Sequence, residues 1–234
     1  MRAWIVLALA TECANGLRRA KLARRLDDEQ DTVEISTLAG NGTGGQADGN
    51  FTNATFNAPC GIDVSPDGKH IFVSDYGSGR LRQLERETSL VSTYSSAVSS
   101  AYGTAVDPAG SGTVYAVSHG DHDLFAVDAN RDTTTLEDSY NGNSFLWHPR
   151  GMSINPDGTT LYVADTQLSL VTSVSTNGSF APSALYNFTG GAAGQTVYDV
   201  VVHPDGTKLY ATKRTGDNIA EIDLSSGLKS DIVE

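Results

Sequence analysis

The chain has 234 residues, of which 39% are hydrophobic, and its formal net charge is −12. The charge is unevenly distributed, because residues 27–234 hold ten basic and twenty-seven acidic residues, a net charge of −17. Such an acidic domain repels nucleic-acid phosphates and anionic lipid headgroups, which argues against both partners, and two cysteines are too few for a disulfide framework.

The first ten residues resemble a targeting segment. One early charge, Arg2, is followed by an apolar run that ends in an A-x-A pattern at residues 8–10. This is typical of a secretory signal peptide, with an Arg-rich transit peptide or a gene-model artefact as the alternatives. The run is too short to span a bilayer, so no transmembrane segment is expected.

Residues 17–26 are basic and carry leucines at helical spacing. They suit either a short helix on a membrane surface or, as we favour, a remnant of the leader. We therefore assign residues 1–30 to a signal peptide or leader and a linker, and residues 31–234 to the folded domain.

Residues 32–40 alternate in the manner of a β-strand, and residues 41–56 are rich in Gly and Asn and predict a long polar loop. The chain also contains sequons for N-glycosylation, whose density favours a secreted or secretory-pathway location. These sequons begin at Asn41, Asn50, Asn53, Asn177 and Asn187.

Residues 59–84 contain three short apolar runs joined by tight turns, which predict three strands. The first turn, Pro66-Asp67-Gly68, has a physical basis in each residue. Proline presets φ, aspartate bonds to nearby backbone N–H groups, and glycine accepts a positive φ.

The same pattern recurs along the chain. Its turn prolines, Pro66, Pro108, Pro156 and Pro204, are spaced by 42, 48 and 48 residues. A unit of about 40 to 50 residues with three or four strands is typical of a β-propeller blade. We therefore expect an all-β fold, a β-propeller of four-stranded antiparallel blades. The expected blade cores lie near residues 59–95, 102–138, 150–187 and 197–233.

Two parts of the chain resemble known repeats. Residues 33–84 resemble an NHL repeat with its preceding outer strand, through T-L-A-G, a loop with A-D-G, F-N-A-P-C-G, V-S-D and R-L-R. Residues 203–212, H-P-D-G-T-K-L-Y-A-T, are similar to the YVTN repeat of lactonase-like propellers. Both families form β-propellers.

The NHL resemblance also bears on the completeness of the ring. In such propellers the outer strand follows its core, so a strand over residues 32–40 is an orphan with no blade to receive it. This implies an incomplete, open ring of a larger propeller, with about four blades present and apolar faces exposed on both end blades. A compact four-blade ring is the alternative.

In a propeller, the start of each innermost strand lines the central channel, where ligands usually bind. The segment W-H-P-R-G is the most unusual of these starts, because His148 and Arg150 together suit a carboxylate or a phosphate. In the alternative the three residues have only structural roles: Trp147 packs between blades, His148 caps a turn and Arg150 pairs with an acidic neighbour. The candidate ligand-binding residues are Asn57, Tyr102, Trp147, His148, Arg150, Tyr198 and Asp199.

Metal-dependent enzymes of similar fold are the competing class. Amidating propeller lyases resemble NHL chains and bind zinc with several channel histidines, and a zinc site needs three or four ligands. Only His148 is expected in the channel, because His119 and His122 are predicted to lie in a solvated strand connection. Gluconolactonase-type propellers hold a cation such as Ca²⁺ with carboxylates and amides, for which only Asp199 and Asn57 are candidates.

We therefore expect no catalytic residue, no metal site and no cofactor, with Ca²⁺ or Zn²⁺ as the alternative. The favoured function is a noncatalytic, secreted scaffold that binds a protein or glycan partner. The alternative is a metal-dependent lactonase-like or lyase-like enzyme, here partial. Cys60 is expected to be a small packed residue that is left alone if Cys13 is removed with the leader, while Asp75 and Asp165 are expected to bond to turn backbone.

Overall fold

The computed structural model describes residues 36–137, 145–177, 182–187, 196–214 and 218–232. The predicted leader and linker lie outside these residues. Within them the chain forms four antiparallel sheets. The first has the spatial order β1-β5-β4-β3-β2 and is built from β1 (Gly49–Asn50), β2 (Pro59–Val64), β3 (His70–Asp75), β4 (Arg80–Glu85) and β5 (Leu90–Ser95).

The other three sheets have four strands each, in the order of the sequence. The second contains β6 (Ala101–Val106), β7 (Val114–Ser118), β8 (Leu124–Val127) and β9 (Thr133–Glu137). The third contains β10 (Pro149–Ile154), β11 (Thr160–Asp165), β12 (Leu170–Ser175) and β13 (Pro182–Asn187). The fourth contains β14 (Val197–Val202), β15 (Lys208–Lys213), β16 (Asn218–Asp223) and β17 (Lys229–Ile232).

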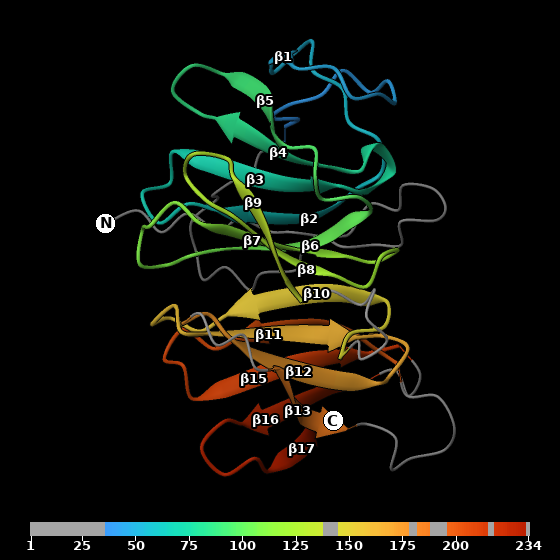
Figure 1. Cartoon of the computed structure of the whole chain (residues 1–234), viewed down its shortest axis with the longest axis vertical. Coiled ribbons are helices and arrows are strands. Elements are labelled where there is room, and N and C mark those ends of the chain that lie inside the picture. The colour runs from blue at the N-terminus through green and yellow to red at the C-terminus, as the bar shows by residue number, and fades with distance from the viewer. Residues whose placement is uncertain (1–35, 138–144, 178–181, 188–195, 215–217, 233–234) are drawn as a thin grey trace, which may run out of the picture.

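The sheets are the blades of an open propeller. The innermost strands lie side by side in chain order, β2 next to β6, β6 next to β10 and β10 next to β14. Figure 1 shows the first and fourth sheets at opposite ends of the long axis, so the arc does not close on itself. The expected fold class, an open ring of antiparallel blades, is confirmed. No helix in the described part of the chain has the length and apolar character needed to cross a membrane.

The turns have the conformation that the sequence predicts. Gly68 has φ 71° and Gly158 has φ 76°, in the left-handed region that glycine tolerates. Asp67 accepts a hydrogen bond from the Lys69 N–H at 3.0 Å. A different constraint applies inside β6, where a Cβ on Gly103 would lie 2.2 Å from the Arg150 carbonyl oxygen. That glycine lets neighbouring innermost strands approach closely.

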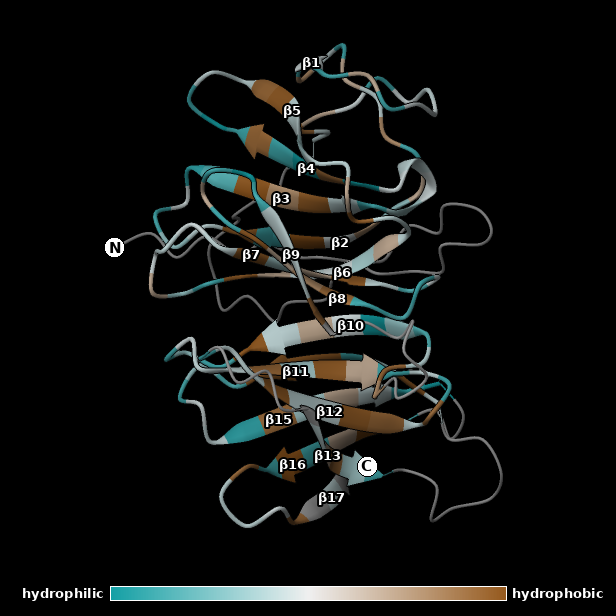
Figure 2. Cartoon of the chain, viewed as in Figure 1, coloured by the Kyte–Doolittle hydropathy of each residue, from teal (hydrophilic) through white to brown (hydrophobic). Residues whose placement is uncertain are grey.

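The apolar cores lie between blades. Phe72 and Leu81 of the first blade pack on Val106 and Phe125 of the second, and the next two junctions are built in the same way. Nearly every residue of β3, β7 and β11 is buried, and Figure 2 shows brown, apolar segments within β3 and β11. Continuous apolar runs follow because both faces of the sheet are covered.

The free face of the first blade is covered by the N-terminal cover, which we define as residues 39–57. Phe51 and Ala54 pack on Ile71 and Val73, and β1 pairs with β5. The expectation of an exposed apolar face at this end is therefore wrong. The strand expected over residues 32–40 is also absent from its described part, residues 36–40. Cys60 is disulfide-bonded, which corrects its expected state as a lone packed cysteine.

Arg82 holds the N-terminal cover in place. Its side chain is 0% exposed, and it donates to Asp48 Oδ1 at 2.7 Å and to Asp75 Oδ2 at 3.3 Å. It also donates to the carbonyl oxygens of Ala47 and Thr55, each at 3.0 Å. One buried guanidinium therefore joins the cover to the inner end of the first blade.

The free face of the fourth blade is open. Ile219 is 46% exposed, whereas the residues at its position in the other blades, Leu81, Leu124 and Val171, are fully buried against the next blade. Val201 on β14 is exposed as well. Buried and exposed residues therefore alternate along β14, as in a sheet with one covered face.

The two positions predict different costs for the same substitution. Val171→Asp buries an unpaired carboxylate and is expected to lower the free energy of unfolding by about 3 kcal/mol or more. Ile219→Asp leaves the carboxylate in water and is expected to cost less than about 1 kcal/mol. Urea unfolding of both variants measures the difference, and equal losses would show that the fourth blade is covered in solution.

Arg82 and Arg80 give a second matched pair on one strand. Arg82→Met leaves Asp75 buried without its cation and should cost about 3–5 kcal/mol. Arg80→Met removes a half-buried side chain with one bond to Thr93 and should cost less than about 1 kcal/mol. Thermal unfolding tests this, and a small loss for Arg82→Met would contradict the anchoring role.

Candidate functional site

The starts of three innermost strands share a backbone conformation. In the first three blades the residue before the start is left-handed, with φ 50° at Ala58, 47° at Ser100 and 60° at His148. The turn after the second strand is bonded to the same segment, for example through His119 N–H to the Ser100 carbonyl at 3.1 Å. Side chains from both segments therefore meet at one rim of the channel.

A buried aspartate braces this rim in two blades. Asp165 accepts hydrogen bonds from the backbone N–H groups of Trp147 and Leu168. Asp75 accepts one from the Asn57 N–H at 2.7 Å. Burial raises the pKa of Asp165 to about 6, against the lowering effect of these N–H bonds. Both aspartates bond to backbone, as the sequence suggests, and Asp165 positions Trp147.

Three imidazoles form one half of the site. His119 and His148 stack with ring centroids 4.8 Å apart and planes inclined by 17°. The His122 ring lies 4.6 Å from His148 and 5.4 Å from Trp147. The His148 N–H donates to His122 Nδ1 at 2.9 Å, so His122 is held as a neutral acceptor at this nitrogen.

Alternating cations and tyrosines form the other half. The Arg150 guanidinium lies between the rings of Tyr102 and Tyr198, at 5.0 and 4.2 Å from their centroids. Arg150 also donates to the Tyr102 hydroxyl at 3.0 Å. Arg214 donates to the Tyr198 hydroxyl at 2.7 Å. These are cation–π arrangements reinforced by hydrogen bonds.

The two halves join because the Tyr102 ring lies 5.5 Å from His119. Tyr76 of the first blade adds an edge contact to both of these rings. The result is a continuous row of side chains drawn from all four blades, which we call the aromatic strip. Its members are Tyr76, Tyr102, His119, His122, Trp147, His148, Arg150, Tyr198 and Arg214.

Five of the seven predicted ligand-binding residues belong to the strip: Tyr102, Trp147, His148, Arg150 and Tyr198. Trp147 is 49% exposed, so it does not fill a junction between blades. The bonds of Arg150 to described residues go to tyrosine and not to an acidic neighbour.

The other two predicted residues do not join the strip. The Asn57 amide donates to the Gly77 carbonyl at 2.9 Å and holds the turn. Asp199 accepts from the Val200 N–H at 2.9 Å, and its carboxylate lies against Gly151. The surrounding protein raises the pKa of Asp199, although the residue is open to solvent. Neither residue contributes a ring or a cation to the strip.

Sequence reasoning missed Tyr76, His119, His122 and Arg214. His119 and His122 lie in the connection between β7 and β8, as expected, but they are partly buried and not solvated, because His148 contacts both rings. A usable signal was present, since Tyr76, His119 and Arg214 are each the first residue after a second strand. Equivalent positions in repeated blades face the same rim.

The ring arrangement bears on metal binding. Among the described residues, no three His, Cys, Asp or Glu side chains are arranged to hold a metal ion. The stacked planes of His119 and His148 place the rings face to face. Burial first, then the charge of Arg150 and then the two other histidines lower the pKa of His119 to about 4.

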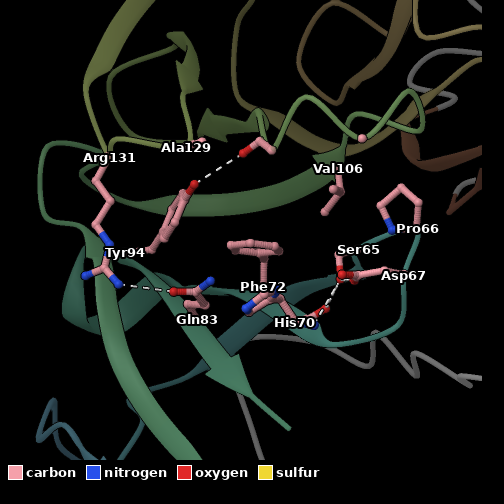
Figure 3. A pocket seen from close by; sticks show the side chains of 12 residues that line it. Ser65, Pro66, Asp67, His70, Phe72, Gln83, Tyr94, Val106, Ala129 and Arg131 are labelled. Atoms are coloured by element: carbon pink, nitrogen blue, oxygen red, sulfur yellow. Dashed lines mark hydrogen bonds between the residues drawn. The ribbon is translucent and has the colours of Figure 1, made fainter. Parts of the chain in front are cut away.

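A separate cavity of about 410 Å³ lies between the first and second blades, at the opposite ends of their strands (Figure 3). Phe72 and Tyr94 line it in an edge-to-face contact 4.9 Å between centroids. Its polar groups are bonded within the protein, as Arg131 donates to Gln83 at 3.2 Å. The cavity is therefore a gap at a blade junction and offers no convergent unpaired groups.

No protein-family model and no curated protein matches the chain. Solved structures do match. An auxiliary nutrient binding protein from Bacteroides thetaiotaomicron has a TM-score of 0.67 at 15% identity, over 85% of this chain and 48% of that one. A catalytically inactive virginiamycin B lyase from Staphylococcus aureus, bound to quinupristin, has a TM-score of 0.59 at 13% identity, over 74% and 55%.

A nidogen–laminin complex also matches, with a TM-score of 0.52 at 15% identity over 74% of this chain and 79% of the matched one. At these identities the likeness establishes the β-propeller fold. The chain spans about half the length of the nutrient-binding protein and of the lyase.

The depressed pKa of His119 predicts how stability depends on pH. The folded state binds this proton only near pH 4, whereas an unfolded histidine binds it near about 6.5. His119 therefore contributes stability above pH 6.5 that is lost as the pH falls toward 4. Asp165, whose folded pKa is raised, acts in the opposite direction, so the wild type must be compared with His119→Gln.

The expected result is that the wild type loses more stability than His119→Gln between pH 6.5 and 4. Urea unfolding across this range measures the difference, and imidazole NMR shifts report the pKa itself. A His119 that titrates near pH 6.5 would contradict the packed environment described here.

Proposed function

We propose that the protein is a noncatalytic binding propeller that holds a glycan or protein partner on the aromatic strip. The observation that carries this proposal is the continuity of the strip across all four blades. Rings with a polar tip provide apolar contact area and a hydrogen bond at a low cost in side-chain entropy. Tyrosine, tryptophan and arginine are also the residues that dominate binding energy at interfaces.

The strip is already organised without a partner. Hydrogen bonds fix the tyrosine hydroxyls of Tyr102 and Tyr198, and the Asp165 carboxylate holds the Trp147 backbone. Such preorganisation lowers the entropy lost when a ligand binds. It favours a recognition surface that stays in one conformation.

The proposal includes an NHL-type propeller that is secreted. Supporting features are the NHL-like motifs of residues 33–84, the signal-like pattern of the first ten residues, and exposure of the asparagine in all five sequons. A disulfide-bonded Cys60 suits an oxidising compartment. Among the structurally similar proteins, one is described as nutrient binding and another lies in a complex with laminin.

Trp147 provides the test. The chain has one other tryptophan, Trp4, so the Trp4→Phe chain reports Trp147 fluorescence alone. Ligands selected on a glycan array should change this fluorescence on titration. Trp147→Ala should weaken binding of the same ligands by 10-fold or more, about 1.4 kcal/mol, because it removes the exposed end of the strip.

Phe145→Ala is the matched control, since Phe145 is 51% exposed, close in sequence and outside the strip. It should leave binding unchanged. Equal losses in both variants, or no binding of any glycan or protein partner by a folded chain, would contradict the proposal. A melting temperature raised by excess Ca²⁺ or Zn²⁺ would favour the metal-dependent alternative.

A further inference from the structure

The cations of the aromatic strip have tyrosine hydroxyls as hydrogen-bond partners, whereas some other basic residues of the described chain pair with carboxylates. Arg82 and Lys208 pair with carboxylates, at 2.7 and 2.8 Å. Arg150 and Arg214 form no ion pair with any described residue, and their hydrogen bonds go to tyrosine hydroxyls. Two guanidinium groups therefore share one rim of an acidic domain without an acidic partner from its described part.

Arg150 is also poorly satisfied as a donor. Its Nε is buried and has no hydrogen-bond partner, and two tyrosine rings cover the faces of its guanidinium. A guanidinium that is removed from water in this way is stabilised most by an anion at the edge that the tyrosine rings leave uncovered. The planar fork of an arginine suits the two oxygens of a carboxylate or a sulfate.

Arg150 places a positive charge at this rim, and three carboxylates act on the strip as well, Asp121 and Asp123 on His122 and Asp199 on Tyr102. Arg150 and the neighbouring imidazoles both oppose protonation of His119. A long polyanion would reach beyond the strip and meet the surrounding acidic surface, which repels it. A short ligand with a few charges avoids this repulsion.

The rings beyond Arg150 define the rest of the ligand. Tyr102, His119, His148, His122 and Trp147 continue the strip from the second blade to the third. This row of five side chains is longer than a single small anion. A ligand that contacts all of it must therefore be larger. Trp147, at the end of this row, is 49% exposed, and an exposed aromatic face matches the apolar face of a sugar ring.

We propose that the strip binds an acidic oligosaccharide, whose carboxylate or sulfate groups lie at Arg150 and Arg214 and whose sugar rings stack toward Trp147. This inference rests on the proposed binding function and specifies its ligand class. Uronate and sulfated sugars share the chemistry that the two arginines recognise. A matched pair of ligands separates charge from shape.

The experiment uses the full-length chain and calorimetric titration with three probes. These are a tetragalacturonate, its fully methyl-esterified form, and a heparin-derived tetrasaccharide. We expect the free acid or the sulfated probe to bind at least 10-fold more tightly than the neutral ester. Tight binding of the tetragalacturonate alone identifies carboxylate as the preferred group. Tight binding of the heparin-derived tetrasaccharide alone identifies sulfate.

Arg214→Gln removes an exposed cation and should reduce binding of the acidic probe by at least 10-fold while leaving the weak binding of the ester unchanged. Arg150→Gln should do the same, but it disturbs a packed side chain, so Arg214→Gln is the decisive variant. Arg131→Gln, beside the separate cavity, is the matched control and should change nothing. Loss of affinity with added salt supports the charge contact.

Equal affinity for the free acid and its methyl ester would overturn the acidic ligand class and leave the proposed binding function standing. An acidic preference that survives Arg214→Gln and Arg150→Gln would place the anion elsewhere and also overturn the inference. Failure of all three probes, with a folded protein, overturns it as well. The Trp147→Ala comparison with partners from the array then tests the binding function independently.

Discussion

The blades of this protein depend on the cover that neighbouring segments give to their apolar faces. The strands β3, β7 and β11 have mostly apolar centres and are buried along nearly their whole length, so a blade that stands alone would leave an apolar face in water. Three junctions supply most of that cover, with about 25 cal/mol gained for each Å² of apolar surface removed from water. The blades therefore stabilise one another in series, as in other repeat proteins.

The two ends of the series meet this constraint differently. At the first blade the N-terminal cover takes the place of a neighbour, fixed by the buried Arg82. At the fourth blade Ile219 is exposed where the inner blades bury an apolar residue, and Val201 on β14 is exposed as well. The described structure is thus sealed at one end and open at the other. The fourth blade has a covered face on one side only, so its local opening should cost less than that of an inner blade.

The repeat itself could be predicted from sequence because it depends on local signals. The Pro-Asp-Gly turns and the alternating runs mark blade positions, and Gly68 and Gly158 have the positive φ that this reading requires. The N-terminal cover could not be predicted, since residues 41–56 have the composition of a solvated loop. Its anchor, Arg82, resembles any other charged residue of a strand until its buried partners are known.

The sequence predicted where residues of the candidate site lie in the fold better than it predicted which of them contact one another. Residues at the starts of the innermost strands were identified, because the fold sends that position to the channel. The histidines were not combined, since His119 and His148 come from different blades and meet only through the rotation between sheets. Side chains that are distant in sequence and belong to separate repeats leave no local pattern that would indicate their contact.

Arg150 has a consequence for how binding and folding are connected. It belongs to the third blade, yet it is held between a tyrosine of the second blade and a tyrosine of the fourth. The guanidinium thus fastens two successive junctions, and the half of the strip that carries the cations exists only while the fourth blade is docked. A ligand bound there would stabilise the docking of the fourth blade on the third, and detachment of the fourth blade would release the ligand. The affinity for the ligand and the docking equilibrium of the fourth blade are therefore thermodynamically linked.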